Sequence, residues 1–209
     1  MEITAVLVKQ LRERSGAGIM NCKEALREAQ GDLEKATDIL RKKGLAAAGK
    51  RAHRATHEGA VGSYVHAGGR IGVLVEVNCE TDFVARTKEF QQLVKDLAMQ
   101  VAAASPRFVR REEIPGAVLE REREIFRAQA RDSGKPEKVW ENIIKGRVEK
   151  FYAEQCLVDQ PFVRDPNLTI RERINSFITQ TGENVKVSRF ARFALGESSD
   201  GNGETPDGD

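Results

Sequence analysis

A seven-residue segment has the spacing of a phosphate-binding loop, whose backbone amides hold the phosphates of a nucleotide. Residues 44–50 read Gly-Leu-Ala-Ala-Ala-Gly-Lys, which fits G-x-x-x-x-G-K. The next residue is Arg51, where such a loop needs Ser or Thr to bind magnesium. A true loop of this kind leaves a buried strand and opens a helix, whereas this segment follows a predicted helix. We therefore interpret the spacing as a chance match.

A thiol and an imidazole could together form a nucleophile and its base. His66 and Cys79 come at the ends of two predicted paired strands, so contact between them is sterically conceivable. No third residue that would orient the histidine can be identified, and a Cys after a Val-rich strand is more typically a small buried apolar group. We interpret Glu76 and Glu80 as surface charges rather than an acid and base pair. Since the three cysteines include no Cys-x-x-Cys pair, we expect no metal, no cofactor and no redox chemistry.

A run of basic residues could bind nucleic acid. Residues 41–54 contain six Lys or Arg, one His and no acidic residue. Clustered cations neutralise phosphates without needing a particular fold. However, no aromatic residues are interleaved for base stacking, and the formal net charge of the whole chain is only +2. We therefore expect no specific nucleic-acid partner, and keep an RNA- or ribosome-binding adaptor as the alternative function.

The sequence Thr81-Asp82-Phe83-Val84 stands where a predicted strand meets a predicted helix. Thr81 or Asp82 can cap that helix through its side-chain oxygen. This leaves Phe83, a large apolar ring, at the turn and outside the apolar stripe of the helix, as a candidate anchor for a partner. Alternatively, Phe83 folds under as a staple on its own helix, and the pattern alone does not choose between the two.

Three short helices are predicted in residues 1–44. Thr4 and Asn21 are expected as the N-caps of the first two, and the third is expected to run from Asp32 to Gly44. A module of this size is near the lower limit for folding alone, so we expect it to lean on the rest of the chain or on a partner. Residues 45–58 then predict a mobile basic linker.

Residues 59–196 predict an α+β core, in which a small antiparallel sheet packs against helices. Alternating apolar residues from Ala60 onward predict a hairpin with a Gly-rich turn, and residues 184–195 predict a last strand. Helical spacing is found over three segments and after a capping box that opens at Thr169 and leads to Gly182. The three segments are 90–101, 118–131 and 137–155.

The composition of the two ends of the chain and its hydropathy predict a disordered tail and the location of the protein. Residues 197–209 contain five acidic residues and no basic or apolar one, so we expect a disordered tail. No apolar run approaches the ~20 residues that span a bilayer, and the first residues do not resemble a signal peptide. We therefore expect a cytoplasmic protein with no membrane partner.

The sequence resembles bacterial elongation factor Ts. The opening stretch, with Ile3-Thr4-Ala5, Gly16-Ala17-Gly18 and Cys22-Lys23, is similar to the first domain of that family. Residues 77–85, Val-Asn-Cys-Glu-Thr-Asp-Phe-Val-Ala, are similar to its core signature. The similarity continues to the end of the predicted core, through residues 133–136, 146–151, 160–163 and 189–190.

This resemblance implies a guanine-nucleotide exchange factor and not an enzyme. The implied partner is elongation factor Tu, in its GDP-bound and nucleotide-free forms. Asp82 and Phe83 would intrude beside the nucleotide site, near the magnesium and phosphate region, so that GDP leaves. Thr81 and Val84 belong to the same motif and are expected to contact the partner with them. A partner that prefers the nucleotide-free state weakens GDP binding by the same factor that GDP weakens its own.

The resemblance also implies how the rest of the chain is used. The three helices would form a ubiquitin-associated-like domain that docks on the GTPase domain of the partner, with Arg12, Ile19 and Met20 in contact. His66 would approach the same GTPase domain. Because the chain looks like a short member with a single core, we expect a homodimer formed through the sheets, with the last strand offering an edge. We expect it to lack the helical hairpin inserted in longer members.

Overall fold

A computed structural model describes residues 3–197 of the chain, so the predicted tail, apart from Glu197, lies outside the described residues. The first three helices are α1 (Ala5–Ser15), α2 (Ile19–Glu28) and α3 (Leu33–Arg51). They enclose a small apolar core of their own, formed by Leu11, Ala17, Cys22, Ala25, Leu26, Ala29, Ala36 and Leu40. The expected cap at Thr4 is confirmed, and Asp32, the predicted start of the third helix, caps α3; both side chains accept hydrogen bonds from backbone amides of the first turn.

Two predictions for these helices are wrong. Helix α2 begins at Ile19 after Gly18, so Asn21 lies inside the helix and does not cap it. Helix α3 continues through Gly44 to Arg51, so residues 45–51 are helix and not linker. Gly44 is buried, and a Cβ built on it would lie 3.3 Å from the Thr179 hydroxyl oxygen. This close approach explains why packing prevails over the low helix propensity of glycine.

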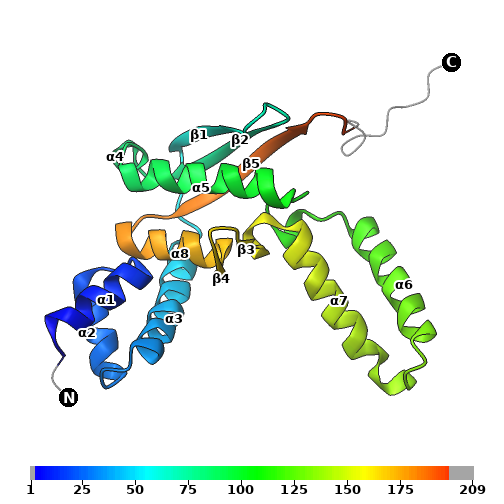
Figure 1. Cartoon of the computed structure of the whole chain (residues 1–209), viewed down its shortest axis with the longest axis horizontal. Coiled ribbons are helices and arrows are strands. Elements are labelled where there is room, and N and C mark those ends of the chain that lie inside the picture. Colours follow the sequence, from blue (N-terminus) through cyan, green and yellow to red (C-terminus); the bar gives the residue numbers. More distant parts are fainter. Residues whose placement is uncertain (1–2, 198–209) are drawn as a thin grey trace.

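The core contains one sheet of three antiparallel strands in the order β1-β2-β5. The strands are β1 (Glu58–Val65), β2 (Ile71–Cys79) and β5 (Val185–Ala194), close to the predicted segments. Helix α5 (Lys88–Ala104) covers one face of the sheet (Figure 1). The interface is apolar because β2 alternates, with Val73, Val75 and Val77 pointing inward toward α5.

Helix α8 (Ile170–Thr181) joins the helical module to this core. It opens with the predicted capping box, in which Thr169 and Glu172 satisfy each other's backbone amides, and ends at Gly182 in the left-handed conformation. The Phe177 ring of α8 lies 5.9 Å from the Phe90 ring of α5. On the other side, the Ser176 hydroxyl donates a 2.8 Å hydrogen bond to the Ser15 carbonyl of α1. The module therefore rests on the core of its own chain.

A pair of helices projects from the core, which corrects our expectation that the chain lacks a helical hairpin. Helices α6 (Gly116–Asp132) and α7 (Trp140–Gln155) pack against each other as a long arm (Figure 1). Both were predicted as helices, and the short connection between them, which includes the 3-10 helix Glu137–Val139, makes them antiparallel neighbours. Strands β3 (Pro161–Phe162) and β4 (Asp165–Thr169) then lead into α8.

The base of this arm is held by further short elements. The 3-10 helices Arg111–Glu113 and Leu157–Asp159 flank it, and the Arg111 side chain bridges them by its 3.0 Å bond to the Asp159 carboxylate. The predicted α+β class, with a small antiparallel sheet packed against helices, is confirmed. Among residues 3–197, no helix combines the length and apolar character needed to cross a membrane.

Candidate partner-binding site

Phe83 is displayed on the surface at the turn that follows β2. Helix α4 (Asp82–Ala85) begins after Thr81, whose hydroxyl accepts a 3.3 Å hydrogen bond from the Val84 amide. The Phe83 side chain is 78% exposed, while Val84 is 6% exposed and belongs to the core. Of the two readings left open by the sequence, the displayed ring is therefore the one adopted. Val84 supports the turn from beneath and leaves little of its side chain for a partner.

The carboxylate of Asp82 lies beside Phe83 and is accessible. It accepts a 2.7 Å hydrogen bond from Arg86, one helical turn further along the chain. Both side chains are more than half exposed, and exposed ion pairs of this kind contribute little to stability. An incoming charged group could therefore replace Arg86 as the partner of Asp82.

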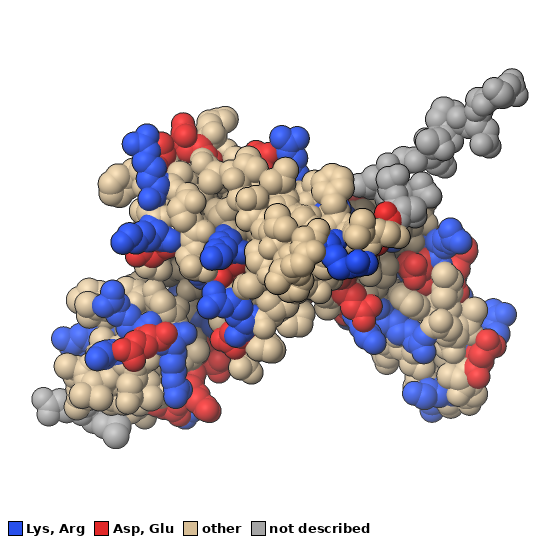
Figure 2. All heavy atoms as spheres, turned by 45° about the horizontal axis from the view of Figure 1, so that its top comes forward, with Lys and Arg blue, Asp and Glu red and all other residues tan. Residues whose placement is uncertain are grey.

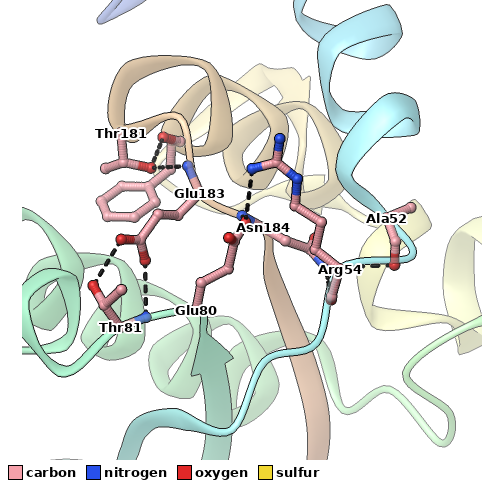
Figure 3. A network of polar contacts seen from close by, with 8 residues as sticks. Ala52, Arg54, Glu80, Thr81, Thr181, Glu183 and Asn184 are labelled. Atoms are coloured by element: carbon pink, nitrogen blue, oxygen red, sulfur yellow. Dashed lines mark hydrogen bonds and ion pairs between the residues drawn. The ribbon is translucent and has the colours of Figure 1, made fainter.

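Glu183 and Asn184, which belong to no recognisable motif, hold this turn in place. The Glu183 carboxylate accepts a 3.1 Å hydrogen bond from the Thr81 amide and a 2.7 Å bond from the Thr81 hydroxyl (Figure 3). Next to it, Asn184 donates from its backbone amide to the Glu80 carboxylate. Glu183 and Thr81 are 102 residues apart, so no local pattern could have predicted their contact.

Asn184 connects the same region to the chain that leaves α3. Its side-chain amide donates hydrogen bonds to the carbonyls of Arg54, at 2.9 Å, and Ala52, at 3.4 Å (Figure 3). The residue is buried, and buried amide groups are costly unless they find such partners. The turn that carries Phe83 and the exit of α3 are thus fixed to one tripeptide, Gly182-Glu183-Asn184.

A second candidate surface lies on the helical module. Arg12 is exposed on α1, and Ile19 and Met20 are 55% and 74% exposed at the start of α2. Exposed apolar side chains of this size are available for contact with another molecule. In Figure 1, α4 and the pair α1 and α2 lie at the same end of the molecule, opposite the arm formed by α6 and α7.

His66 is not close to the turn of Phe83. It follows β1 in the hairpin connection, where its amide donates to the Ile71 carbonyl. Its ring Nδ1 lies 3.1 Å from the Tyr64 hydroxyl. Strand β2 has nine residues and separates this connection from α4, a distance of about 27 Å at the usual rise of a strand. His66 and Phe83 therefore mark opposite ends of the hairpin.

The same separation excludes a couple between His66 and Cys79. Cys79 pairs with Glu58 at the far end of the ladder, so the conceived contact is wrong. The Cys79 thiol donates a 3.1 Å hydrogen bond to the Thr81 carbonyl, and burial, followed by the Glu183 charge, raises its pKa to about 11. A thiol with that pKa is protonated at neutral pH and is a poor nucleophile. Nowhere in residues 3–197 do three or more His, Cys, Asp or Glu side chains form a group suited to a metal ion.

The basic run around the end of α3 is partly neutralised. Lys43 pairs with Glu28 at 2.9 Å, and Arg54 pairs with Glu80 at 3.4 Å. The spacing that resembled a phosphate loop, 44–50, lies within α3, where backbone amides bond to the helix itself. On the face shown in Figure 2, basic and acidic side chains are interspersed at both ends of the molecule. That distribution does not favour a phosphate backbone as the main partner.

Comparison with known proteins assigns this architecture to a family. The family model of elongation factor Ts matches residues 27–197. Elongation factor Ts of Geobacter sulfurreducens is 64% identical over 197 residues, which cover 94% of this chain and 91% of that protein. The proteins of that name from Thermoanaerobacter sp. (strain X514) and Carboxydothermus hydrogenoformans are 58% and 57% identical over 195 residues, 93% of this chain and 96% and 90% of theirs. This chain therefore belongs to the elongation factor Ts family of translation elongation factors.

Proposed function

We propose that this chain is a guanine-nucleotide exchange factor for elongation factor Tu and performs no covalent chemistry itself. The observation that carries the proposal is the exposed Phe83 ring, held on a short helix that the core anchors. An aromatic ring buries a large apolar area with few rotatable bonds to immobilise, which suits a side chain that enters a partner.

The proposed mechanism is a difference in affinity between two states of the partner. Phe83 enters beside the nucleotide site, and Asp82 presents its carboxylate near groups that otherwise serve the magnesium ion. If the factor binds the nucleotide-free form more tightly than the GDP-bound form, GDP and the factor weaken each other's binding by one common factor. GDP leaves because binding of the factor shifts elongation factor Tu toward the state that has low affinity for GDP.

The helical module supplies a separate docking surface in this proposal. Arg12, Ile19 and Met20 contact the GTPase domain as part of a ubiquitin-associated-like domain, and His66 makes a further contact from the hairpin connection. Met20 is a flexible apolar side chain and Arg12 a long polar one, both common in protein interfaces. The two surfaces have different roles. The helical module sets the affinity for the partner, and Phe83 disturbs the nucleotide site.

We also propose that the chain forms a homodimer in the cytoplasm. The sheet face opposite α5 exposes Val61, Val65, Leu74 and Phe193, which are between 50% and 71% exposed. These side chains come from all three strands, and the register places Val65 and Phe193 on either side of Gly72. Large apolar side chains exposed on one face of a sheet favour burial against another surface, and a second copy offers the same face by symmetry.

The function is tested by the release of a fluorescent GDP analogue from elongation factor Tu in the presence of catalytic amounts of this protein. The native protein is expected to accelerate release, and Phe83→Ala to abolish most of that acceleration. Ile125→Ala, which truncates an exposed apolar side chain on α6, is the matched control and should remain active. No acceleration by the native protein would contradict the proposed function, and equal acceleration by Phe83→Ala would contradict the role of the ring.

RNA binding, measured beside GDP release, separates this proposal from an RNA- or ribosome-binding adaptor. Neutralising Lys50, Arg51 and Arg54 should weaken an adaptor uniformly and reduce its salt dependence. An exchange factor should keep its activity in that variant. RNA binding that depends on these charges, with no acceleration of GDP release by the native protein, would favour the adaptor.

A further inference from the structure

Helix α4, which displays Phe83, is too short to be stable by itself. One helical turn forms too few hydrogen bonds to offset the ordering of its backbone. Its C-terminal side is held by nearby residues, since Val84 is buried beneath it and Thr87 donates a 2.8 Å hydrogen bond to the Val84 carbonyl. Its N-terminal side, which bears Phe83, is held by Glu183 from the far end of the chain.

Glu183 uses both of its carboxylate oxygens on Thr81. One oxygen accepts the 3.1 Å bond from the Thr81 amide and the other the 2.7 Å bond from the Thr81 hydroxyl (Figure 3). The same hydroxyl accepts from the Val84 amide at 3.3 Å. A directed chain of hydrogen bonds therefore runs from Val84 through Thr81 to Glu183, and hydrogen bonds in such chains polarise and strengthen one another.

The chemistry of this contact requires a carboxylate. An ionised carboxylate only accepts hydrogen bonds, so its two oxygens can serve the two donors of Thr81 together. A glutamine at position 183 has one oxygen and would present its NH₂ group to one of those donors. Hydrogen bonds to a charged acceptor are also about twice as strong as neutral ones.

We propose that Glu183 is a positioning residue for Phe83. Its carboxylate fixes the N-terminal end of α4 and thereby the direction in which the ring meets the partner. Glu183 acts through Thr81 and makes no contact with nucleotide or magnesium. The inference rests on the proposed exchange function and deepens it, because it names what keeps the ring in an active orientation.

The neighbours of Glu183 hold its own backbone still. Gly182 has a φ of +79°, which turns the chain sharply at the end of α8. Asn184 is bound on the other side, to Glu80 through its amide and to the Arg54 carbonyl through its side chain. Arg54 lies just beyond α3, the last helix of the docking module. The contacts of Asn184 therefore fix the turn that carries Phe83 relative to the segment that leaves that module.

The first test compares Glu183→Gln with a matched control. Glu113→Gln is suitable because the Glu113 carboxylate also accepts a backbone hydrogen bond, from Val109 at 2.9 Å, at the base of the arm. In the GDP-release assay, Glu183→Gln should lower the maximal rate about tenfold, as loss of a charge-assisted hydrogen bond would. The factor concentration for half-maximal rate should stay within about twofold, because α1 and α2 are unchanged. Glu113→Gln should leave both quantities unchanged.

The second test asks whether Glu183 acts through Thr81. Thr81→Val removes the hydroxyl that links Glu183 to Val84, and its combination with Glu183→Gln should reduce the rate little further than either change alone. Thr81→Ser keeps the hydroxyl and should lower the rate much less than Thr81→Val does. Multiplied effects in the double variant would overturn the assigned path through Thr81.

A third measurement needs no partner. In the isolated protein, amide hydrogen exchange at Thr81 and Val84 should be faster in Glu183→Gln than in Glu113→Gln. If the native protein does not accelerate GDP release from elongation factor Tu, the proposed exchange function is wrong. The amide exchange rates still decide whether Glu183 holds the turn. If the native protein is active and Glu183→Gln matches Glu113→Gln in both rate and amide exchange, the positioning role is overturned and the function stands.

Discussion

Gly62 on β1 and Val94 on α5 approach each other so closely that no side chain fits at position 62. A Cβ atom built on Gly62 would lie 2.2 Å from Cγ1 of Val94. The glycine thus allows α5 to lie flat on the sheet that leads to α4. We expect Gly62→Ala to lower the free energy of unfolding by about 1–3 kcal/mol, as other overpacked cores do. Urea unfolding followed by circular dichroism would measure the change.

Gly72 offers the matched control for this substitution. A Cβ on Gly72 would meet no atom within 4 Å, although the residue lies on the neighbouring strand β2. Gly72→Ala should therefore leave stability nearly unchanged. Adding Val94→Ala to Gly62→Ala should restore part of the lost stability, because the smaller residue makes room. Strictly additive losses would show that the contact is not the cause.

The buried thiols of Cys79 and Cys156 predict a loss of stability at alkaline pH. Burial raises the pKa of both to about 11, helped by the charges of Glu183 and Asp159 respectively. In the unfolded chain a thiol has a pKa of about 8.5, so between that value and 11 the unfolded state holds fewer protons than the folded state. The free energy of unfolding should then fall with rising pH, by up to about 1.4 kcal/mol per pH unit for each thiol.

This pH dependence is measurable by urea unfolding at a series of pH values from 8 to about 11, where the two thiols titrate. The variant that carries both Cys79→Ala and Cys156→Ala should show a shallower decline than the native protein, whatever its stability at pH 8. An equal slope in the two proteins would assign the decline to other groups, such as Lys and Tyr side chains.

A pair of buried glutamines ties the projecting arm to the core. Gln160 is 2% exposed and donates hydrogen bonds to the carbonyls of Glu154, at 2.8 Å, and Ala104, at 3.3 Å. Its side-chain oxygen accepts a 3.0 Å bond from Gln100, which is fully buried. Gln160→Leu keeps the approximate volume but leaves these groups unpaired. We expect a loss of about 2–4 kcal/mol in unfolding free energy, by chemical denaturation.

The control for that variant is Gln129→Leu on the exposed face of α6, which makes the same chemical change where water can satisfy the neighbours. It should alter stability by less than about 0.5 kcal/mol. A small effect of Gln160→Leu as well would mean that the buried carbonyls find other partners, and that the arm is anchored mainly by its apolar base.

Local signals in the sequence were sufficient for most of the elements. The caps at Thr4, Asp32 and Thr169 act within one helical turn, and the alternation over 71–77 reports directly which face of β2 is buried. The end of α3 could not be obtained in this way. Gly44 is a stop signal by propensity, and its helical state depends on Thr179, 135 positions later.

The candidate site was predictable in its residues but not in its geometry. The family resemblance pointed to Asp82 and Phe83. The sequence pattern of the following helix allowed the Phe83 ring either to be exposed at the turn or to pack on its own helix. Its exposure follows from burial of Val84 instead, which depends on how α4 meets the sheet. The hydrogen bonds between Glu183 and Thr81 join residues 102 positions apart, so no local sequence pattern predicts them.

The exposed sheet face provides a last prediction, that a single charge will separate the proposed dimer. Leu74 lies in the central strand of that face, between Ser63 and Ala191, and is 50% exposed. Leu74→Glu would place a second carboxylate in the middle of the proposed interface, two residues from Glu76, which already engages Arg189, and association would remove the water around the new charge. The substitution should leave the monomer folded, because the side chain points away from α5.

Sedimentation equilibrium at micromolar concentration measures the outcome. The native protein should have twice the mass of the chain, and Leu74→Glu the mass of one chain. Ile125→Glu on α6 serves as the control, since it adds the same charge to an exposed apolar position outside the sheet, and should remain dimeric. A native protein that sediments as a monomer would contradict the dimer. A Leu74→Glu variant that still dimerises would show that the interface is not the face of the sheet. The free edge of β5 would then be the next surface to test, because an unpaired strand edge can add a strand from a second copy.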